Sequence, residues 1–122
     1  DQNVPNFGVS KTEWIAQLIL VYTGEIMNGG HSQFFLNRGK KQLFSTLSAL
    51  NKISICGCAR ILSSASTIVG DDTTLTNLSS SGLNELHKLD SKAWEHLADI
   101  DSVLLRFLKK NEFDLLVQER GK

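Results

Sequence analysis

The sequence predicts an all-α protein, and three observations support this fold class. Apolar residues recur at helical spacing along most of the chain, no segment shows a convincing strand-like alternation, and only one of the 122 residues is proline. A chain of this length fits one domain, and an apolar content of 41% is enough for one core. We therefore expect residues 1–122 to form a compact single-domain bundle of about five to seven helices.

The first predicted helix follows an irregular lead-in, residues 1–9. It starts with a capping-box pattern at Ser10, whose side chain can accept a hydrogen bond from the backbone three residues later. An apolar stripe at helical spacing runs to Asn28, where Gly29 or Gly30 supplies the left-handed residue that ends a helix. The stripe consists of Ile15, Leu18, Ile19, Tyr22 and Ile26.

Residues 28–39, N-G-G-H-S-Q-F-F-L-N-R-G, form the most distinctive stretch of the chain. Two glycines interrupt the apolar pattern, three large apolar residues follow, and Asn-Arg-Gly is typical of a helix end. We expect the apolar residues to anchor a short helix in the core, and the amide side chains to satisfy backbone groups at its two ends. The anchors are Phe34, Phe35 and Leu36, and the amides are Asn28, Gln33 and Asn37.

Two further helices are expected between residues 43 and 70. Asn51-Lys52 interrupts the apolar pattern between them, and Gly70 ends the second. Small residues in the second helix would let a neighbouring helix approach closely. A polar loop rich in Ser and Thr, residues 71–81, follows.

The last third of the chain predicts a helical segment over residues 83–89 and then a long final helix. Asp90 or Ser91 is the expected N-cap of that helix, and Asn111 is expected to break it. Residues 113–117 predict one more short amphipathic turn or helix.

No pattern of reactive residues predicts catalysis or metal binding. Cys56 and Cys58, two apart on a helix, point in different directions and close no useful disulfide, so we expect both to be buried packing residues. His87 and His96 would face opposite sides of a helix, and His31 is expected to form hydrogen bonds or lie at the surface. Nucleophile-elbow, P-loop and dinucleotide-binding motifs are absent. We therefore expect a protein that is not an enzyme and needs no cofactor or metal.

The charges balance overall but not along the chain. Thirteen basic residues match thirteen acidic ones, which argues against global attraction to nucleic acid. The first 61 residues carry six basic and three acidic residues, whereas the remaining 61 carry seven basic and ten acidic residues. Two oppositely charged faces are one interpretation, and ordinary solvated helix faces are the other. The candidate partner-binding residues are the acids Glu95, Asp99 and Asp101 and the bases Arg38, Lys40 and Lys41.

One motif resembles a known family. The pattern Glu25-x-x-Asn28-Gly29-Gly30-x-x-Gln33-Phe34-Phe35-x-Asn37 is similar to the signature of a bacterial domain family of unknown function that is typified by a DNA-mimic protein. The resemblance continues through Leu47–Leu50, Cys58–Ala65 and Leu89-Asp90-Ser91, and so covers most of the chain from Trp14 to Phe113. It implies a compact, non-enzymatic, all-α domain that acts by binding another protein.

Two classes of function then remain. The DNA mimicry of the family's typifying member is not expected of this chain, because residues 85–101 hold five acids against two lysines, a net charge of −3. A helix of that length spans about 25 Å, over which duplex DNA carries on the order of 15 negative charges. We therefore favour a non-catalytic inhibitor, such as an immunity or antitoxin-like protein that occludes a bacterial toxin. The alternative is a DNA-mimic-type regulator that sequesters a DNA-binding protein.

The expected partner is another protein, and a second copy of the chain is left open. The sequence contains no run of 18 apolar residues, so it predicts no membrane span. Since Asp1 is not a translation start, either an initiator methionine was omitted or a signal peptide was removed. The bacterial cytoplasm is slightly favoured, and the second case would place the protein in the periplasm.

Overall fold

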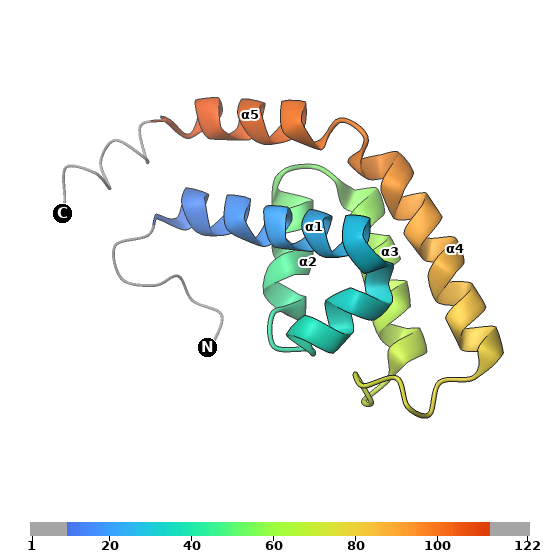
Figure 1. The fold of residues 1–122 in the computed structure, drawn as a ribbon. Helices are drawn as coiled ribbons and strands as arrows, with labels where there is room; N and C mark the ends of the chain where they lie inside the picture. Colours follow the sequence, from blue (N-terminus) through green and yellow to red (C-terminus); the bar gives the residue numbers. More distant parts are fainter. Residues whose placement is uncertain (1–9, 113–122) are drawn as a thin grey trace.

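The computed structural model describes residues 10–112, so the segments predicted at residues 1–9 and 113–117 lie outside its described part. Within this range the protein is all-α, with five helices and no strand, which confirms the predicted fold class (Figure 1). The helices are α1 (Lys11–Arg38), α2 (Leu43–Lys52), α3 (Cys56–Val69), α4 (Ser80–Leu97) and α5 (Ile100–Lys110). None of them is long and apolar enough to cross a bilayer.

Helix α1 begins as predicted, and it consists of two helical stretches that meet at the predicted double glycine. The Ser10 Oγ accepts a hydrogen bond from the Glu13 backbone N–H at 3.0 Å, which confirms the cap. The first helical stretch ends at Gly30, whose φ of 75° and ψ of −166° are not helical, and a second stretch runs on from there to Arg38. The predicted turn between a long and a short helical stretch therefore exists, as the kink of α1, and Gly30 is the glycine with the positive φ.

The helices wrap around the kinked α1 (Figure 1). Helix α4 packs against both α1 and α3, α2 packs against α1 and α3, and α5 returns alongside the first half of α1. The centre of the core is aromatic. The Phe34 ring meets Tyr22 and Phe35 edge-to-face, with ring centroids 5.6 and 5.3 Å apart, and all three side chains are fully buried.

Two predicted core positions are wrong. Leu36 is 57% exposed, because three consecutive residues on a helix spread over about 200° and cannot all face one core. Cys56 is also exposed, since it is the first residue of α3. Cys58 is buried as predicted, and burial raises the pKa of its thiol to about 11.

The chain after residue 79 is divided differently from the prediction. Ser79 is the N-cap of α4, its Oγ accepting from the Gly82 N–H at 3.0 Å, so helix begins at Ser80, inside the segment predicted as loop. Asp90 lies in the middle of α4 and is not its N-cap. The predicted long last helix is interrupted at residues 98–99, which separate α4 from α5.

Candidate partner-binding surface

The kink in α1 is fixed by a buried hydrogen-bond network that joins it to α4. Asp90 Oδ1 accepts from the His31 backbone N–H at 2.8 Å and lies 2.6 Å from His31 Nδ1. His31 Nε2 lies 2.8 Å from the Tyr22 hydroxyl. Nδ1 donates to the carboxylate, which can only accept, and Nε2 is hydrogen-bonded to the hydroxyl. Burial, and then the nearby Cys58 and Asp90, raise the Tyr22 pKa, which keeps the hydroxyl protonated.

This network occupies the interior. The His31 and Tyr22 side chains are fully buried, and each of the three polar side chains bonds to another member. The two bonds between His31 and Asp90 connect residues 59 positions apart in the sequence, and so they join α1 to α4. The hydrogen-bonding role predicted for His31 is confirmed.

A second cluster, centred on Glu25, holds the two halves of α1 together across the kink. The Glu25 carboxylate accepts from Gln33 Nε2 at 2.8 Å, from Asn37 Nδ2 at 3.2 Å and from Arg38 Nε at 3.1 Å. Gln33 and Asn37 therefore bond a side chain, and the prediction that they satisfy backbone groups is wrong. Asn28 is exposed. Two amides and a guanidinium are needed here because a buried carboxylate is costly unless it is hydrogen-bonded.

Glu25 makes the stability of the protein depend on pH. Burial raises its pKa, but the bonds from Gln33, Asn37 and Arg38 lower it more, so the pKa lies below the ordinary value. Its stabilising contribution is then present above the unfolded-state pKa of about 4.3 and is lost as the pH falls through the lower folded-state pKa.

We expect Glu25→Gln to lower the free energy of unfolding at pH 7 by about 2 kcal/mol, because charge-assisted bonds are lost. The gap between wild type and variant should narrow as the pH falls from 5 to 3 in urea-unfolding series. The exposed Glu85→Gln should change little at any pH. A gap that stayed constant with pH would contradict this assignment.

An apolar groove lies on the outer side of α1. It has a volume of about 570 Å³ and is lined by residues of α1, α4 and the start of α5. Leu20 and Met27 of α1 and Trp94 of α4 are 55%, 45% and 49% exposed. We call this the α1–α4 groove; its lining is Leu20, Thr23, Gly24, Met27, Trp94, Leu97, Ala98, Ile100 and Asp101.

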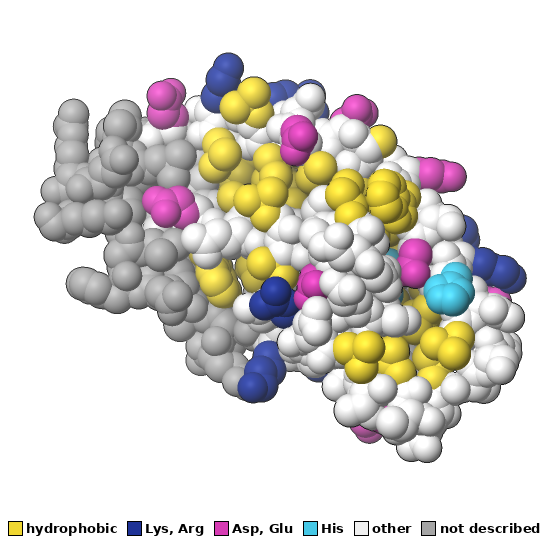
Figure 2. Space-filling view, in the orientation of Figure 1, with side chains coloured by type: hydrophobic (Ala, Val, Ile, Leu, Met, Phe, Trp, Pro, Cys, Tyr) yellow, Lys and Arg dark blue, Asp and Glu magenta, His cyan; other side chains and the backbone are white. Residues whose placement is uncertain are grey.

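Figure 2 shows a band of hydrophobic side chains along the line where α5 and the end of α4 pass beside α1, with acidic side chains at its border. Asp101 lines the α1–α4 groove, and Asp99 is exposed in the break between α4 and α5. Glu95 follows Trp94 but lines a different pocket, between α3 and α4. Glu95 and Asp99 do not share one helix, because α4 ends at Leu97.

The three predicted basic residues lie apart from this groove. Arg38 pairs with Glu25, and the Lys40 ammonium lies 3.5 Å from the Ser66 carbonyl oxygen. Lys41 is exposed. Arg38 and Lys40 thus have intramolecular partners, whereas Lys41 is placed to meet solvent.

The sequence prediction missed the apolar members of the groove. Leu20, Gly24 and Met27 recur at helical spacing, and they form a second stripe beside the core stripe of α1. An amphipathic helix needs only one apolar stripe to face the core, so a second apolar stripe indicates an exposed apolar surface. The exposure of Trp94 could not be predicted in this way, because it lies next to the core positions Ala93 and Leu97 and reads as part of the same apolar stripe.

Within residues 10–112, no three His, Cys, Asp or Glu side chains are grouped so that they could hold a metal ion. The described fold and surface are those of a small helical domain with a buried polar scaffold and an exposed apolar groove. The family model of the DMP19-like protein matches residues 9–117, so the chain belongs to this family. Searches of curated proteins and of solved structures each give no significant match.

Proposed function

We propose that the protein is a non-catalytic inhibitor that binds another protein, and that it acts as an immunity or antitoxin-like protein by occluding a bacterial toxin. The observation that carries the proposal is the half-exposed Trp94 in the α1–α4 groove. Large aromatic side chains at the centre of a concave apolar surface are the usual energetic anchors of protein interfaces. Leu20 and Met27 extend the apolar area on α1.

The border of the groove suggests the chemistry of the partner. Asp101 lines it and Asp99 is exposed close by in the chain. Acidic groups around an apolar centre attract a basic surface and speed association with it. We infer a partner that presents an apolar side chain surrounded by lysine or arginine, as a nuclease-type toxin would.

The charges of α4 and α5 favour this class over DNA mimicry. From residue 80 to residue 110 the chain has five acidic and five basic residues, so the acids of α4 are offset by the bases of α5. A surface that imitates duplex DNA needs a dense and uncompensated row of negative charge.

The test is to capture a partner with the wild-type protein and titrate it, once purified, against variants. Trp94→Ala should weaken binding by about 2 kcal/mol, or about thirtyfold. Phe44→Ala is the matched control, because Phe44 is a 77% exposed aromatic residue on α2, outside the groove. It should change affinity less than threefold, a difference of roughly 0.6 kcal/mol.

The nature of the captured protein distinguishes the two classes. Equimolar inhibition of a toxic activity supports the immunity proposal. A DNA-binding protein that duplex DNA displaces supports the regulator instead. If Phe44→Ala weakened binding and Trp94→Ala did not, the groove would be the wrong surface. Self-association lost in Trp94→Ala would make a second copy of the chain its occupant.

A further inference from the structure

Gly24, in the interior of the first helical stretch of α1, has no role that the fold itself explains. Its backbone is helical, since Gly30 is the one residue within α1 that has non-helical angles. A glycine inside a helix costs stability relative to alanine, because it loses more conformational freedom on folding. A Cβ at Gly24 would meet no atom of the described residues within 4 Å. Neither backbone conformation nor packing therefore excludes a side chain at this position.

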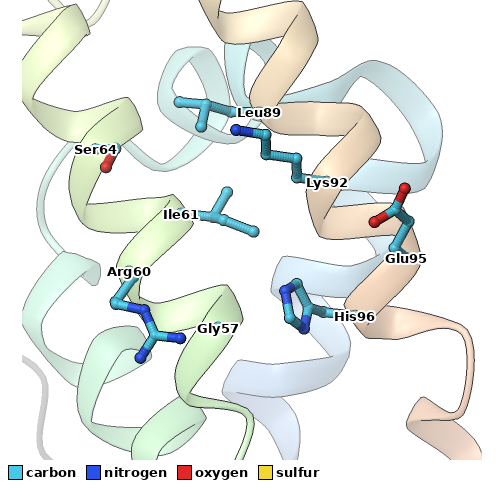
Figure 3. A pocket seen from close by; sticks show the side chains of 8 residues that line it. All are labelled: Gly57, Arg60, Ile61, Ser64, Leu89, Lys92, Glu95 and His96. Carbon is cyan, nitrogen blue, oxygen red and sulfur yellow. The ribbon is translucent and has the colours of Figure 1, made fainter.

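The other described glycines each have a reason within the chain. Those with a positive φ are Gly30, Gly39 and Gly70. Those whose Cβ position is already occupied by a nearby side chain are Gly29, Gly57 and Gly82. Figure 3 shows one such case, in the pocket between α3 and α4: His96 extends from α4 toward Gly57, and a Cβ there would lie 2.6 Å from its Nε2. Among the described glycines, Gly24 alone combines a helical backbone with an unfilled space.

This unfilled space belongs to the α1–α4 groove, whose lining includes Gly24. Leu20 precedes it by four residues and Met27 follows it by three, so the three residues share one face of α1. Leu20 and Met27 are both about half-exposed, and the glycine leaves a gap between them. The groove is therefore open at the point where α1 lacks a side chain.

The side chains around the gap favour an aromatic occupant. Trp94 of α4 is 49% exposed in the same groove, and aromatic pairs are more favourable than their buried area alone accounts for. The Met27 thioether also makes favourable contacts with aromatic rings. Asp101 is an exposed carboxylate in the lining, and it favours a positive charge beside the ring.

We propose that Gly24 determines the specificity of the α1–α4 groove, as the seat for an aromatic side chain that is flanked by a positive charge on the bound protein. This inference rests on the proposed function, because it identifies the anchor that the same surface would accept. It also accounts for a helix-interior glycine that the fold does not require. Alanine at this position would stabilise the helix and fill the seat.

Phenethylamine is a suitable probe, because it carries an aromatic ring and an ammonium group. It is titrated into the full chain and followed by the indole N–H resonances of the two tryptophans. Binding should be saturable, with a Kd on the order of 1 mM for so small a ligand. The Trp94 resonance should shift, whereas that of Trp14, which does not line the groove, should stay in place. Cyclohexylethylamine, which has no aromatic ring, and phenylacetate, which has the opposite charge, should each bind several-fold more weakly.

Gly24→Ala should weaken phenethylamine binding by about tenfold, the effect of one methyl group in a pocket. The same variant should raise the Tm by about 2 to 5 °C, because it improves the helix. Ser48→Ala is the matched control, since it improves an exposed helical position on α2, outside the groove. It should leave the affinity within about twofold of wild type, which separates a gain in stability from a loss of binding.

Unchanged affinity in Gly24→Ala, or a lower Tm, would overturn the proposed seat. Equal binding of cyclohexylethylamine would overturn the aromatic preference, and equal binding of phenylacetate would overturn the positive charge. With a captured partner, weakening by Trp94→Ala but not by Gly24→Ala would overturn this inference alone. A partner that depends on Gly24 but has no toxic activity would support this inference and overturn the proposed function.

Discussion

Asp90→Ala is expected to lower the free energy of unfolding by about 3 kcal/mol, because it leaves two buried donors without an acceptor. The Asp90 carboxylate is the acceptor for the His31 backbone N–H and for His31 Nδ1. His31 is fully buried and the Asp90 side chain is only 16% exposed, so without the carboxylate the two donors face a site with limited access to water. The loss should appear as a lower urea midpoint at pH 7.

Two further variants test the cause of this loss. Asp90→Asn should fall between wild type and Asp90→Ala, because both bonds end on the single oxygen Oδ1 and an amide oxygen can still accept them, but without the negative charge of the carboxylate. Asp99→Ala removes an exposed acid and should stay within about 0.5 kcal/mol of wild type. A loss below about 1 kcal/mol for Asp90→Ala would mean that the network adds little to stability.

The sequence predicted the local features of the fold because helix caps and apolar stripes are local patterns. The Ser10 cap, the helix ends at Lys52 and Gly70, and a turn at the double glycine all follow from residues within one or two turns. Long-range pairs leave no such pattern. Nothing near Asp90 indicates a bond to a residue 59 positions earlier, so its side chain was read as a local cap.

The resemblance motif acquires a structural meaning from these pairs. Glu25, Gln33 and Asn37 form one cluster, and Gly30 admits the carboxylate that binds His31. These residues support the kinked scaffold through hydrogen bonds within the chain. The groove consists of other residues, such as Leu20 and Trp94, and the motif gave no clue to it. The motif therefore specifies the scaffold, and the candidate contact surface is separate from it.

Gly30→Ala is expected to destabilise the protein by about 4 kcal/mol, through backbone strain and loss of the Asp90 bonds. At φ 75° and ψ −166°, Gly30 has a conformation that is nearly exclusive to glycine. A Cβ there would also overlap the Asp90 carboxylate, 2.6 Å from its Cγ. Backbone strain and overlap with Asp90 would therefore both destabilise the alanine variant.

Gly24→Ala, in the same helix, is the matched control. Gly24 has no atom within 4 Å of an added Cβ, so alanine should stabilise the helix by about 0.5 to 1 kcal/mol. Thermal and urea unfolding of both variants measure the contrast. The double variant Gly30→Ala/Asp90→Ala should lose less than the sum of its parts, because removing the carboxylate removes the overlap. Additive losses would instead assign the whole Gly30 effect to backbone conformation.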